Sequence, residues 1–512
     1  MEAFLSKIEE LNGAVNGFVW GWVGLILLLS TGLIATLSTK VFQVSHIKHW
    51  WVNTIGSLFK KEVIGHTKEK GAISPFQALC TALAATVGTG NIAGVAAAIC
   101  VGGAGAVFWM WVAAFLGMMT NYSENVLGIY FRRRNFSGEW SGGAMYYLSD
   151  GLGSYKGCKK IGKVLAVLFA IFTVLASFGI GNMGQVNKIV LNIQEAFPVK
   201  SLNSIGLYSG ITLYNVVIGG ALLALAALII IGGLKRIANF AEKVIPLMVV
   251  LFVLGSLFII GVNYTHIGKA FASIFTRAFN TKAVWGGATG VALKVIVTQG
   301  FKRGVFSNEA GLGSSVMVHS NSNVKEPVKQ GLWGIFEVFA DTMVVCTMTA
   351  LVIITSGVID LETGVLAEGL SGDATLVSAA FGTVFGTFGS KFVAVCIFLF
   401  AFTTVLGWSH YGSKAIEYLG GEKAVPIYKV IFTLMIMSGA LMTSSIAWDI
   451  SDTFNGLMMI PNLIGVVALS GTVVKITDNY VDRVIKKKDV KPVLSFFDDI
   501  QAANEKELAN TK

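Results

Sequence analysis

Long apolar runs recur from one end of the chain to the other, and they constrain the fold more than any other feature. Each run is roughly 20 residues long, the length that a helix needs to cross the hydrocarbon core of a bilayer. Of the 512 residues, 54% are hydrophobic and 13% are charged, whereas about a quarter of the residues in an ordinary soluble domain are charged. Backbone groups in lipid must be satisfied within the chain, and helices achieve this. The sequence therefore predicts an all-α polytopic membrane protein.

About 11 transmembrane helices are expected, and the segments between them alternate in charge. Lys and Arg gather in every second connection, for example at Arg132–Arg134, and in the tail at Lys486–Lys488. Because basic loops stay in the cytoplasm, this alternation places the N-terminus outside and the C-terminus in the cytoplasm. The net charge of +10 thus indicates sidedness and contact with membrane lipids, and not binding of nucleic acid. The spans are 16–39, 76–101, 105–130, 163–192, 211–233, 243–262, 284–318, 331–356, 391–412, 427–446 and 455–475.

Two of these spans contain residues that break helices. The stretch Thr86 to Gly94 reads TVGTGNIAG, and a second break is predicted at Gly300–Gly304 (GFKRG), about two-thirds of the way along the span 284–318. Unwound backbone at mid-membrane is tolerated only where it is buried in protein or lines a watery cavity. Paired, glycine-interrupted spans are typical of the central site of a transporter. The alternative interpretation is close helix packing, since Gly90 and Gly94 fit the small-xxx-small pattern.

The positions of the two breaks predict an internal repeat. If the N-terminal span is left aside, they fall in the first and sixth of ten spans, the opening helices of two five-helix halves. Halves with an odd number of spans cross the membrane in opposite senses. We therefore predict a 5+5 inverted-repeat core with two discontinuous helices and one extra N-terminal helix. The expected segments are 1–75 (N-terminal helix and basic segment), 76–262 and 284–475 (the two repeats) and 476–512 (cytoplasmic tail).

Four motifs, in this order, closely resemble the alanine/glycine:cation symporter family. They are TVGTGNIAGVAAAI from residue 86, GEWSGGAMYYL from 138, FKRGVFSNEAGLGSS from 301 and TTVLGWSHYG from 403. The resemblance covers residues 15 to 475. It implies the LeuT-like architecture of the amino acid–polyamine–cation superfamily. It also implies uptake of alanine or glycine driven by Na⁺ or H⁺, across the plasma (inner) membrane of a prokaryote.

The first break also looks like that of the related neurotransmitter:sodium symporters. Carried over by position, this resemblance implies a Na⁺ site made by the carbonyls of Ala84 and Val87 and the hydroxyls of Thr403 and Thr404. Neutral oxygens suit a monovalent cation that must leave again. In membrane helices, however, such hydroxyls usually bond to their own backbone, which is the alternative interpretation for both threonines.

Backbone N–H groups freed at the first break suit the carboxylate of a substrate, so we predict contacts with Thr89, Gly90 and Asn91. Gln185, in the fourth span, can accept a hydrogen bond from the substrate ammonium; its alternative role is an interhelical hydrogen bond. Trp408 follows the two threonines by about one turn.

The Trp408 indole would limit the pocket to a small side chain such as that of alanine or glycine. Its alternative role is an ordinary core tryptophan. Gly300 and Phe301, at the predicted second break, complete the set of expected substrate contacts.

Ionisable residues within spans are costly and often functional. Glu337 and Asp341 lie at i and i+4 on one helix face. They belong either to a charge network that closes the cytoplasmic half or holds the broken helix, or to a proton path. Glu124 is expected to pair with Arg132–Arg134. The second broken span and its end also carry Lys294, Lys302, Arg303 and Glu309.

These features predict secondary active symport of a small neutral amino acid with Na⁺ into the cell by alternating access, and H⁺ coupling is the alternative. An ion channel would need filter repeats that meet on an axis, but TVGTGN occurs once. A membrane enzyme would need a motif such as HExxH or GxSxG, and neither is present. We expect no catalytic residues and no cofactor. The expected partners are the amino acid, Na⁺ as coupling ion, and membrane lipids.

Overall fold

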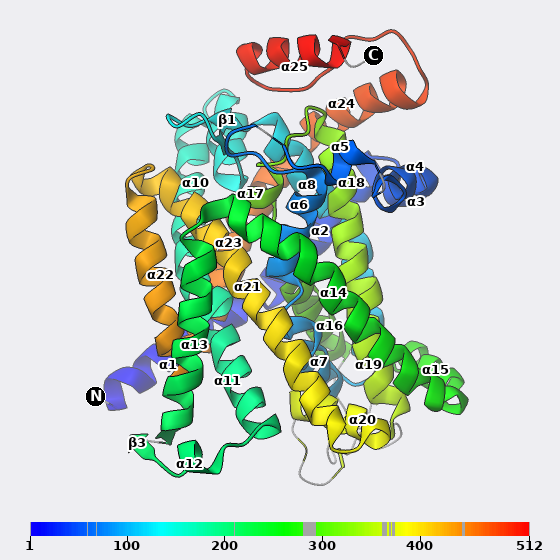
Figure 1. Cartoon of the computed structure of the whole chain (residues 1–512). Coiled ribbons are helices and arrows are strands. Elements are labelled where there is room, and N and C mark those ends of the chain that lie inside the picture. Colours follow the sequence, from blue (N-terminus) through cyan, green and yellow to red (C-terminus); the bar gives the residue numbers. More distant parts are fainter. Residues whose placement is uncertain are drawn as a thin grey trace.

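The computed structural model describes residues 2–58, 60–67, 69–208, 210–279, 293–360, 366–367, 370, 374–442 and 446–510. Within them the chain is almost entirely helical, and the long helices stand side by side as a bundle (Figure 1). The strands of the described residues form two short antiparallel ribbons: β1 (Arg133–Arg134) with β2 (Trp140–Ser141), and β3 (Gly206–Tyr208) with β4 (Ile211–Thr212).

The chain up to residue 262 begins with an N-terminal pair of long helices and continues with the predicted first repeat. The N-terminal elements are α1 (Glu2–Val19), α2 (Trp22–Ser38), α3 (Phe42–Ser45), α4 (Ile47–Asn53), η1 (Ile55–Ser57) and α5 (Lys61–Ile64). They are followed by α6 (Pro75–Thr86), η2 (Thr89–Asn91), α7 (Ala93–Gly102), α8 (Gly105–Tyr130), α9 (Ala144–Tyr146), η3 (Tyr147–Gly151), η4 (Leu152–Ser154), α10 (Lys159–Phe178), η5 (Gly179–Met183), α11 (Gly184–Ala196), α12 (Lys200–Asn203), α13 (Leu213–Ile230) and α14 (Gly233–Val262).

The remaining elements belong to a connecting helix, the predicted second repeat and the tail. They are η6 (Tyr264–His266), α15 (Ile267–Arg277), α16 (Leu293–Asn308), α17 (Val316–His319), α18 (Pro327–Val338), η7 (Phe339–Cys346), α19 (Thr347–Thr355), α20 (Ala374–Phe385), α21 (Phe388–Gly420), α22 (Ala424–Ala440), α23 (Ile446–Ala468), α24 (Ser470–Tyr480), η8 (Val481–Ile485) and α25 (Asp498–Asn510).

Seven helical segments of the described chain are long and apolar enough to cross a membrane. The pair formed by α6 and α7 would add an eighth, and α22 is a shorter apolar helix. An all-α polytopic membrane protein is therefore confirmed, whereas the number of crossings stays a prediction. The seven segments are Lys7–Ser38, Lys159–Ala196, Leu213–Ile230, Gly233–Val262, Pro327–Thr355, Phe388–Gly420 and Asp449–Ala468.

The first discontinuity lies where the sequence predicts it. Helix α6 starts with a capping box, in which the Ser74 hydroxyl accepts from the Gln77 N–H and the Gln77 side chain accepts from the Ser74 N–H. It ends at Thr86, and α7 continues at an angle of 62° to it. The residues between the two helices are buried. The chain therefore bends inside the protein and not in contact with lipid.

The second discontinuity exists, but its predicted position at Gly300–Gly304 is wrong. Helix α16 runs through these residues without interruption and ends at Asn308. The chain then leaves helical geometry until α17, with left-handed φ values of 56° at Glu309, 93° at Gly311 and 74° at Gly313. The part of the predicted span from 284 to 292 lies outside the described residues.

Gly300 is a packing position and not a hinge. A Cβ added there would lie 2.5 Å from Trp109 Cβ and 2.6 Å from the Ala106 carbonyl oxygen, both on α8. The neighbouring Phe301 packs with Leu25 and Ala113. The missing side chain at 300 thus lets α16 lie close against α8, as small residues do in membrane helix pairs.

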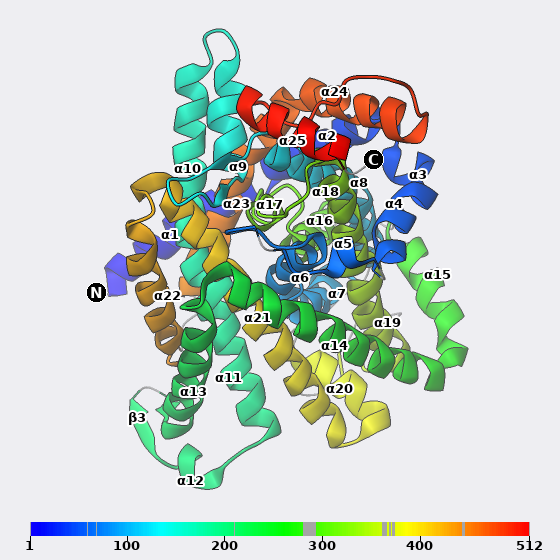
Figure 2. The same cartoon turned by 45° about the horizontal axis from the view of Figure 1, so that its top comes forward.

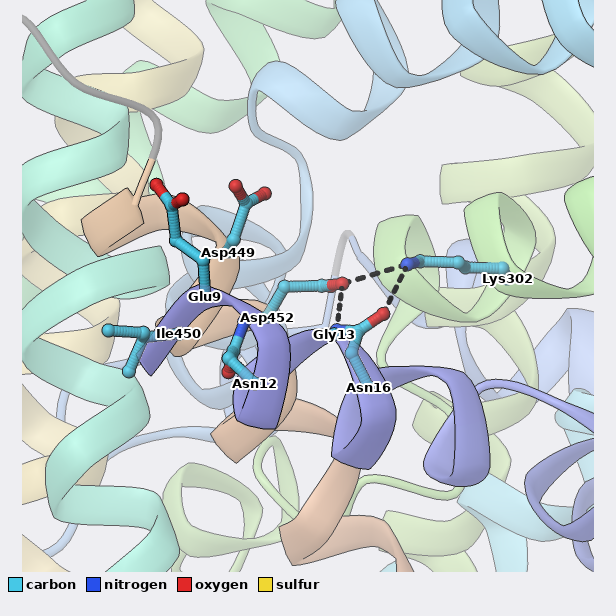
Figure 3. A pocket seen from close by; sticks show the side chains of 8 residues that line it. All are labelled: Glu9, Asn12, Gly13, Asn16, Lys302, Asp449, Ile450 and Asp452. Atoms are coloured by element: carbon cyan, nitrogen blue, oxygen red, sulfur yellow. Dashed lines mark hydrogen bonds and ion pairs between the residues drawn. The ribbon is translucent and has the colours of Figure 1, made fainter. Parts of the chain in front are cut away.

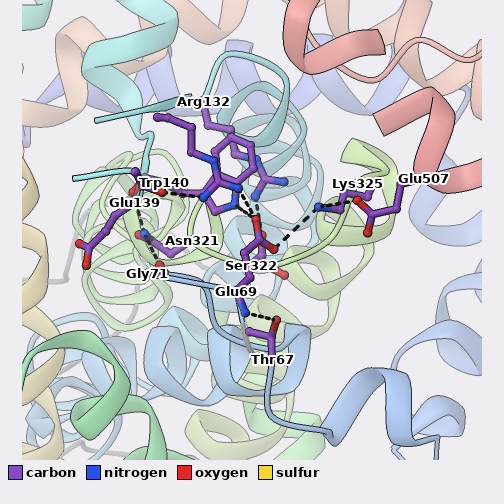
Figure 4. Close-up of polar contacts among 12 residues, drawn as sticks. Thr67, Glu69, Gly71, Arg132, Glu139, Trp140, Asn321, Ser322, Lys325 and Glu507 are labelled. Carbon is purple, nitrogen blue, oxygen red and sulfur yellow. Dashed lines mark hydrogen bonds and ion pairs between the residues drawn. The ribbon is translucent and has the colours of Figure 1, made fainter. Parts of the chain in front are cut away.

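The helices α24 and α25 lie across one end of the bundle, and α12 and α20 lie at the other (Figures 1 and 2). At the end that carries α25, Arg132 donates to the carbonyls of Ser320, Ser322 and Val324 (Figure 4). The predicted pairing of Glu124 with the arginines is therefore wrong. Glu124 accepts from the Asn462 side-chain amide at 2.5 Å instead, because it lies on the buried face of α8 towards α23.

Candidate functional site

The first break, residues 87–91, turns the backbone towards side chains of the bundle. In a continuous helix the Gly88 N–H would point to the Ala84 carbonyl, but here it donates to Asn91 Oδ1 at 2.9 Å. The next N–H, of Thr89, donates to Gln185 Oε1 at 3.4 Å. Side-chain amides thus replace the missing helical partners, as buried backbone groups require. This arrangement also frees carbonyl oxygens at the end of α6.

Asn91 connects the first break to a buried carboxylate. Its amide nitrogen donates to Asp341 Oδ1 at 2.6 Å, and its carbonyl accepts from the Thr349 hydroxyl at 2.7 Å. Asp341 also accepts from Ser307 at 2.7 Å and from Thr342 at 2.8 Å, through Oδ2. The donors to this carboxylate, among the hydrogen bonds of the described residues, are an amide and two hydroxyls. Asp341 therefore lies between the two broken crossings as an acid held by neutral groups.

Helix α21 brings the predicted ion ligand Thr404 to the first break, whereas the hydroxyl of its neighbour Thr403 lies 3.8 Å from Met248 Sδ on α14. A Cβ added to Gly407 would lie 2.6 Å from Ala85 Cβ, so the absence of a side chain lets α21 approach α6. As a result Thr404 Oγ1 lies 2.6 Å from the position that a Cβ on Gly88 would occupy. The residues Ala84 and Val87, which flank this contact, are each 1% exposed.

The hydroxyls of α21 also make the bonds that the alternative interpretation expects. Thr404 donates to the Phe400 carbonyl at 2.9 Å, and Thr403 donates to those of Leu399 and Phe400, both at 2.9 Å. A hydroxyl that donates its proton in this way still has oxygen lone pairs to offer. The self-bonding of both threonines is thus compatible with cation binding, because the ion needs the lone pairs and not the proton.

Gln185, on α11, meets the first break, and Trp408, on α21, packs against η5, the segment that precedes α11. Gln185 accepts from Thr89 as described, and its amide nitrogen donates to the Ile180 carbonyl at 3.1 Å. A Cβ added to Gly181 would lie 2.4 Å from Trp408 Cγ, so the indole packs directly on that backbone. The π-helical segment η5 therefore holds the Gln185 side chain through the Ile180 carbonyl and packs against the Trp408 indole through Gly181.

The last turn of α16, just before the second break, touches the first break. A Cβ added to Gly90 would lie 3.0 Å from Phe306 Cδ1 and 3.5 Å from Ser307 Cα. The last turn of α16 thus faces the first break, whereas Gly300 and Phe301 pack against α8 and α2. Among the predicted substrate contacts, the structure groups Thr89, Gly90, Asn91 and Gln185 and separates Gly300 and Phe301 from them. Trp408 lies against Gly181, four residues before Gln185 in the chain.

Two cavities lie along helices that reach this region. One, of about 360 Å³, is lined by Ser409, His410 and Ser413, which follow Trp408 on α21, and by Asn321 near the end that carries α25. The other, of about 330 Å³, is lined by residues of α1, α16 and α23. In it Lys302 binds Asp452 at 2.8 Å and Asn16 contacts both side chains (Figure 3).

The Lys302 contacts resolve part of the charge network predicted for the broken span. Lys302 also lies over the Trp20 ring, and Lys294 lies over the Trp22 ring. Both lysines therefore attach α16 to the N-terminal helices. This is the interpretation in which charges hold the broken helix, and it does not require a lock on the half that carries α25.

The sequence singled out Asp341 for its cost in a membrane but assigned it no partner. The i, i+4 spacing of Asp341 and Glu337 predicts that the two carboxylates share one helix face and one set of partners. The structure gives them different partners. Glu337 faces His319 at 2.9 Å, whereas Asp341 faces Asn91. The π-helical segment η7 begins between them and shifts the register by which side chains share a face. Ser307 gave no signal in the sequence.

Comparison with known proteins places this geometry in a family context. The chain is 41% identical to the sodium/alanine symporter AgcS of Methanococcus maripaludis over 94% of this chain and 99% of that protein. It is 40% identical to an uncharacterized transporter of Haemophilus influenzae, over 93% and 97% of the two chains. Among solved structures, MhsT in complex with L-phenylalanine matches with a TM-score of 0.51 and 14% identity, covering 79% of this chain and 98% of that chain.

The structural match shows that the chain shares the LeuT-like fold of MhsT. A family model described as the sodium:alanine symporter family matches residues 5–495. Symporters carry their solutes across a membrane, so the protein is a multi-pass transporter of amino acids and cations and not an enzyme. This chain belongs to the sodium:alanine symporter family.

Proposed function

We propose that this protein carries a small neutral amino acid, alanine or glycine, into a prokaryotic cell together with Na⁺. The observation that carries the proposal is the convergence of three elements at Gly88–Asn91: the end of α16, the segment that holds Gln185, and Thr404 on α21. The substrate carboxylate binds N–H groups near Thr89, Gly90 and Asn91, and its ammonium binds Gln185. The N–H groups of Gly88 and Thr89 are held by side-chain amides that a ligand can replace.

In this proposal the Na⁺ binds between α6 and α21. Its ligands are the carbonyls of Ala84 and Val87 and the hydroxyl oxygens of Thr403 and Thr404. The proposal is supported by the close approach of Gly88 to Thr404 and by the two hydroxyls, which donate to their own helix and keep lone pairs free. Four neutral oxygens suit a hard monovalent cation that must be released on the other side.

Access alternates between the cavity at Ser409 and the cavity at Lys302 as the predicted halves, residues 76–262 and 284–475, rock around the site. In this proposal the end that carries α25 faces the cytoplasm, where basic connections are expected to stay, and the N-terminus lies outside. Release then runs along the cavity at Ser409 and His410, and entry passes the Lys302–Asp452 pair. Coupling requires that each ligand raise the affinity for the other by the same factor.

Uptake by purified protein in liposomes tests this function. Radiolabelled alanine should accumulate under an inward Na⁺ gradient and should fail to accumulate when choline replaces Na⁺. Glycine should compete with the labelled alanine. Accumulation that is equal in Na⁺ and in choline would reject Na⁺ coupling, and accumulation of neither amino acid would reject the substrate class.

The direct bond between Asn91 and Asp341 favours a second candidate, H⁺-coupled symport. A carboxylate held by an amide and two hydroxyls can take up a proton as the site opens and closes. In that case alanine uptake in choline would rise with external acidification, and Asp341→Asn would abolish this rise. Measuring uptake in choline at two external pH values distinguishes the two coupling ions.

A further inference from the structure

The carboxylate of Glu309 holds the indole that walls the proposed substrate pocket. Trp408 Nε1 donates to Glu309 Oε1 at 2.9 Å, and the Ser314 hydroxyl donates to Glu309 Oε2. The indole is 1% exposed and Glu309 is 4% exposed. One buried carboxylate thus binds the wall residue on α21 and the far side of the second break at the same time.

Other contacts leave the indole little freedom apart from this hydrogen bond. Its Cβ and Cγ lie against Gly181, where an added Cβ would approach to 2.5 and 2.4 Å. Its ring packs edge-on against Tyr411, with centroids 5.4 Å apart. The Gly181 backbone and the Tyr411 ring restrict where the indole can move, and the bond to Glu309 sets the direction in which its N–H points.

Glu309 is itself fixed by the break. It adopts the left-handed φ of 56°, and its N–H closes the last turn of α16 on the Val305 carbonyl at 2.8 Å. The following segment turns back, with the Leu312 N–H on the Glu309 carbonyl at 3.0 Å. The side chain therefore projects from a rigid turn, and it joins the second broken crossing to the helix that carries Thr404.

We propose that Glu309 is a positioning residue that sets the size limit for the substrate side chain by orienting the Trp408 indole. Glu309 does not bind the amino acid itself. This inference rests on the proposed function, in which Trp408 borders the substrate, and it adds the residue that fixes this border. Without the Glu309 carboxylate the indole can turn away, and larger side chains enter.

Uptake selectivity tests the proposal. The ratio of kcat/KM for alanine to that for 2-aminobutyrate should fall about tenfold in Glu309→Ala, the value of one buried hydrogen bond. Glu309→Gln keeps an acceptor for the indole N–H and should restore most of the ratio. Trp408→Phe removes the donor, so adding Glu309→Ala to it should cause no further change in the ratio.

Glu69→Ala is the matched control. Glu69 also accepts a hydrogen bond from a tryptophan indole, but that of Trp140 and not of Trp408, so the ratio should stay that of the wild type. A loss of uptake in Glu309→Ala that is equal for both amino acids would overturn the proposal. The proposal would also be overturned if the double variant changed the ratio by the product of the two single effects, because the two residues would then act independently.

A second measurement does not depend on transport. In protein labelled with ¹⁵N-tryptophan, the indole signal that disappears in Trp408→Phe should shift in Glu309→Ala and stay nearly in place in Glu309→Gln. An unchanged Trp408 signal in folded Glu309→Ala would overturn the proposal even if alanine proved not to be the substrate. Failure of alanine uptake by the wild type would instead count against the proposed function.

Discussion

The two breaks in the crossing helices are built in different ways. The first, between Thr86 and Ala93, is short and is held by side-chain amides, with Asn91 and Gln185 accepting from backbone N–H groups. The second, from Glu309 to Ser315, is longer and is held by left-handed backbone at Glu309, Gly311 and Gly313 and by a carboxylate. The first break can exchange its partners for ligands, whereas the second is a rigid turn.

The difference indicates separate roles for the two breaks. A side-chain amide oxygen that accepts from a backbone N–H can be replaced by a carboxylate oxygen at little cost, because one acceptor substitutes for another. A turn that depends on positive φ at glycine has no such exchange and resists change. These are the roles that we propose: ligand binding at the first break and support of the pocket wall at the second. Four predictions test this contrast.

Asn91→Ala should have the largest effect, a loss of alanine uptake of about 100-fold or more. The change removes the acceptor of the Gly88 N–H and the amide donor to Asp341 Oδ1 in a buried site, and each such loss costs about 1–3 kcal/mol. Initial uptake rates in liposomes measure the effect. Asn192→Ala is the control, because the Asn192 side chain bonds to the Lys188 carbonyl of its own helix. An uptake rate of Asn91→Ala equal to that of the control would contradict ligand binding at the first break.

Thr404→Ala should raise the Na⁺ concentration for half-maximal uptake about tenfold, because one of four proposed oxygen ligands is lost. Thr404→Ser should restore it. The control is Thr433→Ala, since Thr433 likewise donates to its own helix, at the Lys429 carbonyl, but lies on α22. An identical Na⁺ dependence in Thr404→Ala and Thr433→Ala would mean that the hydroxyl serves its own helix and no ion.

Gly313→Ala should lower the free energy of unfolding by about 2 kcal/mol, because it forces a side chain into left-handed backbone. The new Cβ would also lie 2.7 Å from the Asn462 side chain. Gly94→Ala, on α7, meets no atom of the described residues within 4 Å and should be nearly neutral. Thermal unfolding in detergent measures both. Equal stability of the two variants would show that the second break is not a rigid turn.

Glu69→Gln should have the smallest effect, about 1 kcal/mol or less, because the Glu69 side chain is partly exposed. Burial alone would raise the pKa of the Glu69 carboxyl. The nearby charges of Lys325 and Arg134 together lower the pKa by more than burial raises it, so it lies below its ordinary value of 4.5. A carboxyl with a lowered folded-state pKa stabilises above its unfolded pKa and loses this effect as the pH falls through the folded value.

Glu69 lies just before α6, where it also accepts from the Trp140 indole at 3.0 Å and helps to anchor the first broken crossing (Figure 4). The difference in melting temperature between wild type and Glu69→Gln should therefore be present at pH 7 and vanish well below pH 4. A difference that grows on acidification would contradict the assigned sign.

The sequence predicts the two breaks unequally well, for a physical reason. At the first, TGN combines residues that favour unwinding with an amide that can cap the freed N–H groups, so local chemistry decides the outcome. At the second, two glycines beside Lys302 and Arg303 looked like an interruption. Tertiary packing keeps this segment helical, because Gly300 packs against α8 and Lys302 forms an ion pair with Asp452.

The partners of buried polar groups were out of reach of the sequence for a related reason. Glu124 lies close in the chain to three arginines but bonds to Asn462, which is 338 residues away. Asp341 bonds to Asn91, 250 residues away. Spacing along one helix says which residues share a face, but not which other helix covers that face, and the π-helical segment η7 changes the spacing itself.

By itself the sequence determined that this chain is a helical membrane protein with a break at Gly88–Asn91, because length, apolarity and backbone satisfaction in lipid leave few other solutions. The four ordered motifs also sufficed to indicate its family. The tertiary structure alone decided where the second crossing unwinds, and which carboxylate meets Asn91 and which meets Trp408. Those outcomes depend on contacts between helices that are distant in the chain, where packing and buried hydrogen bonds outweigh local preference.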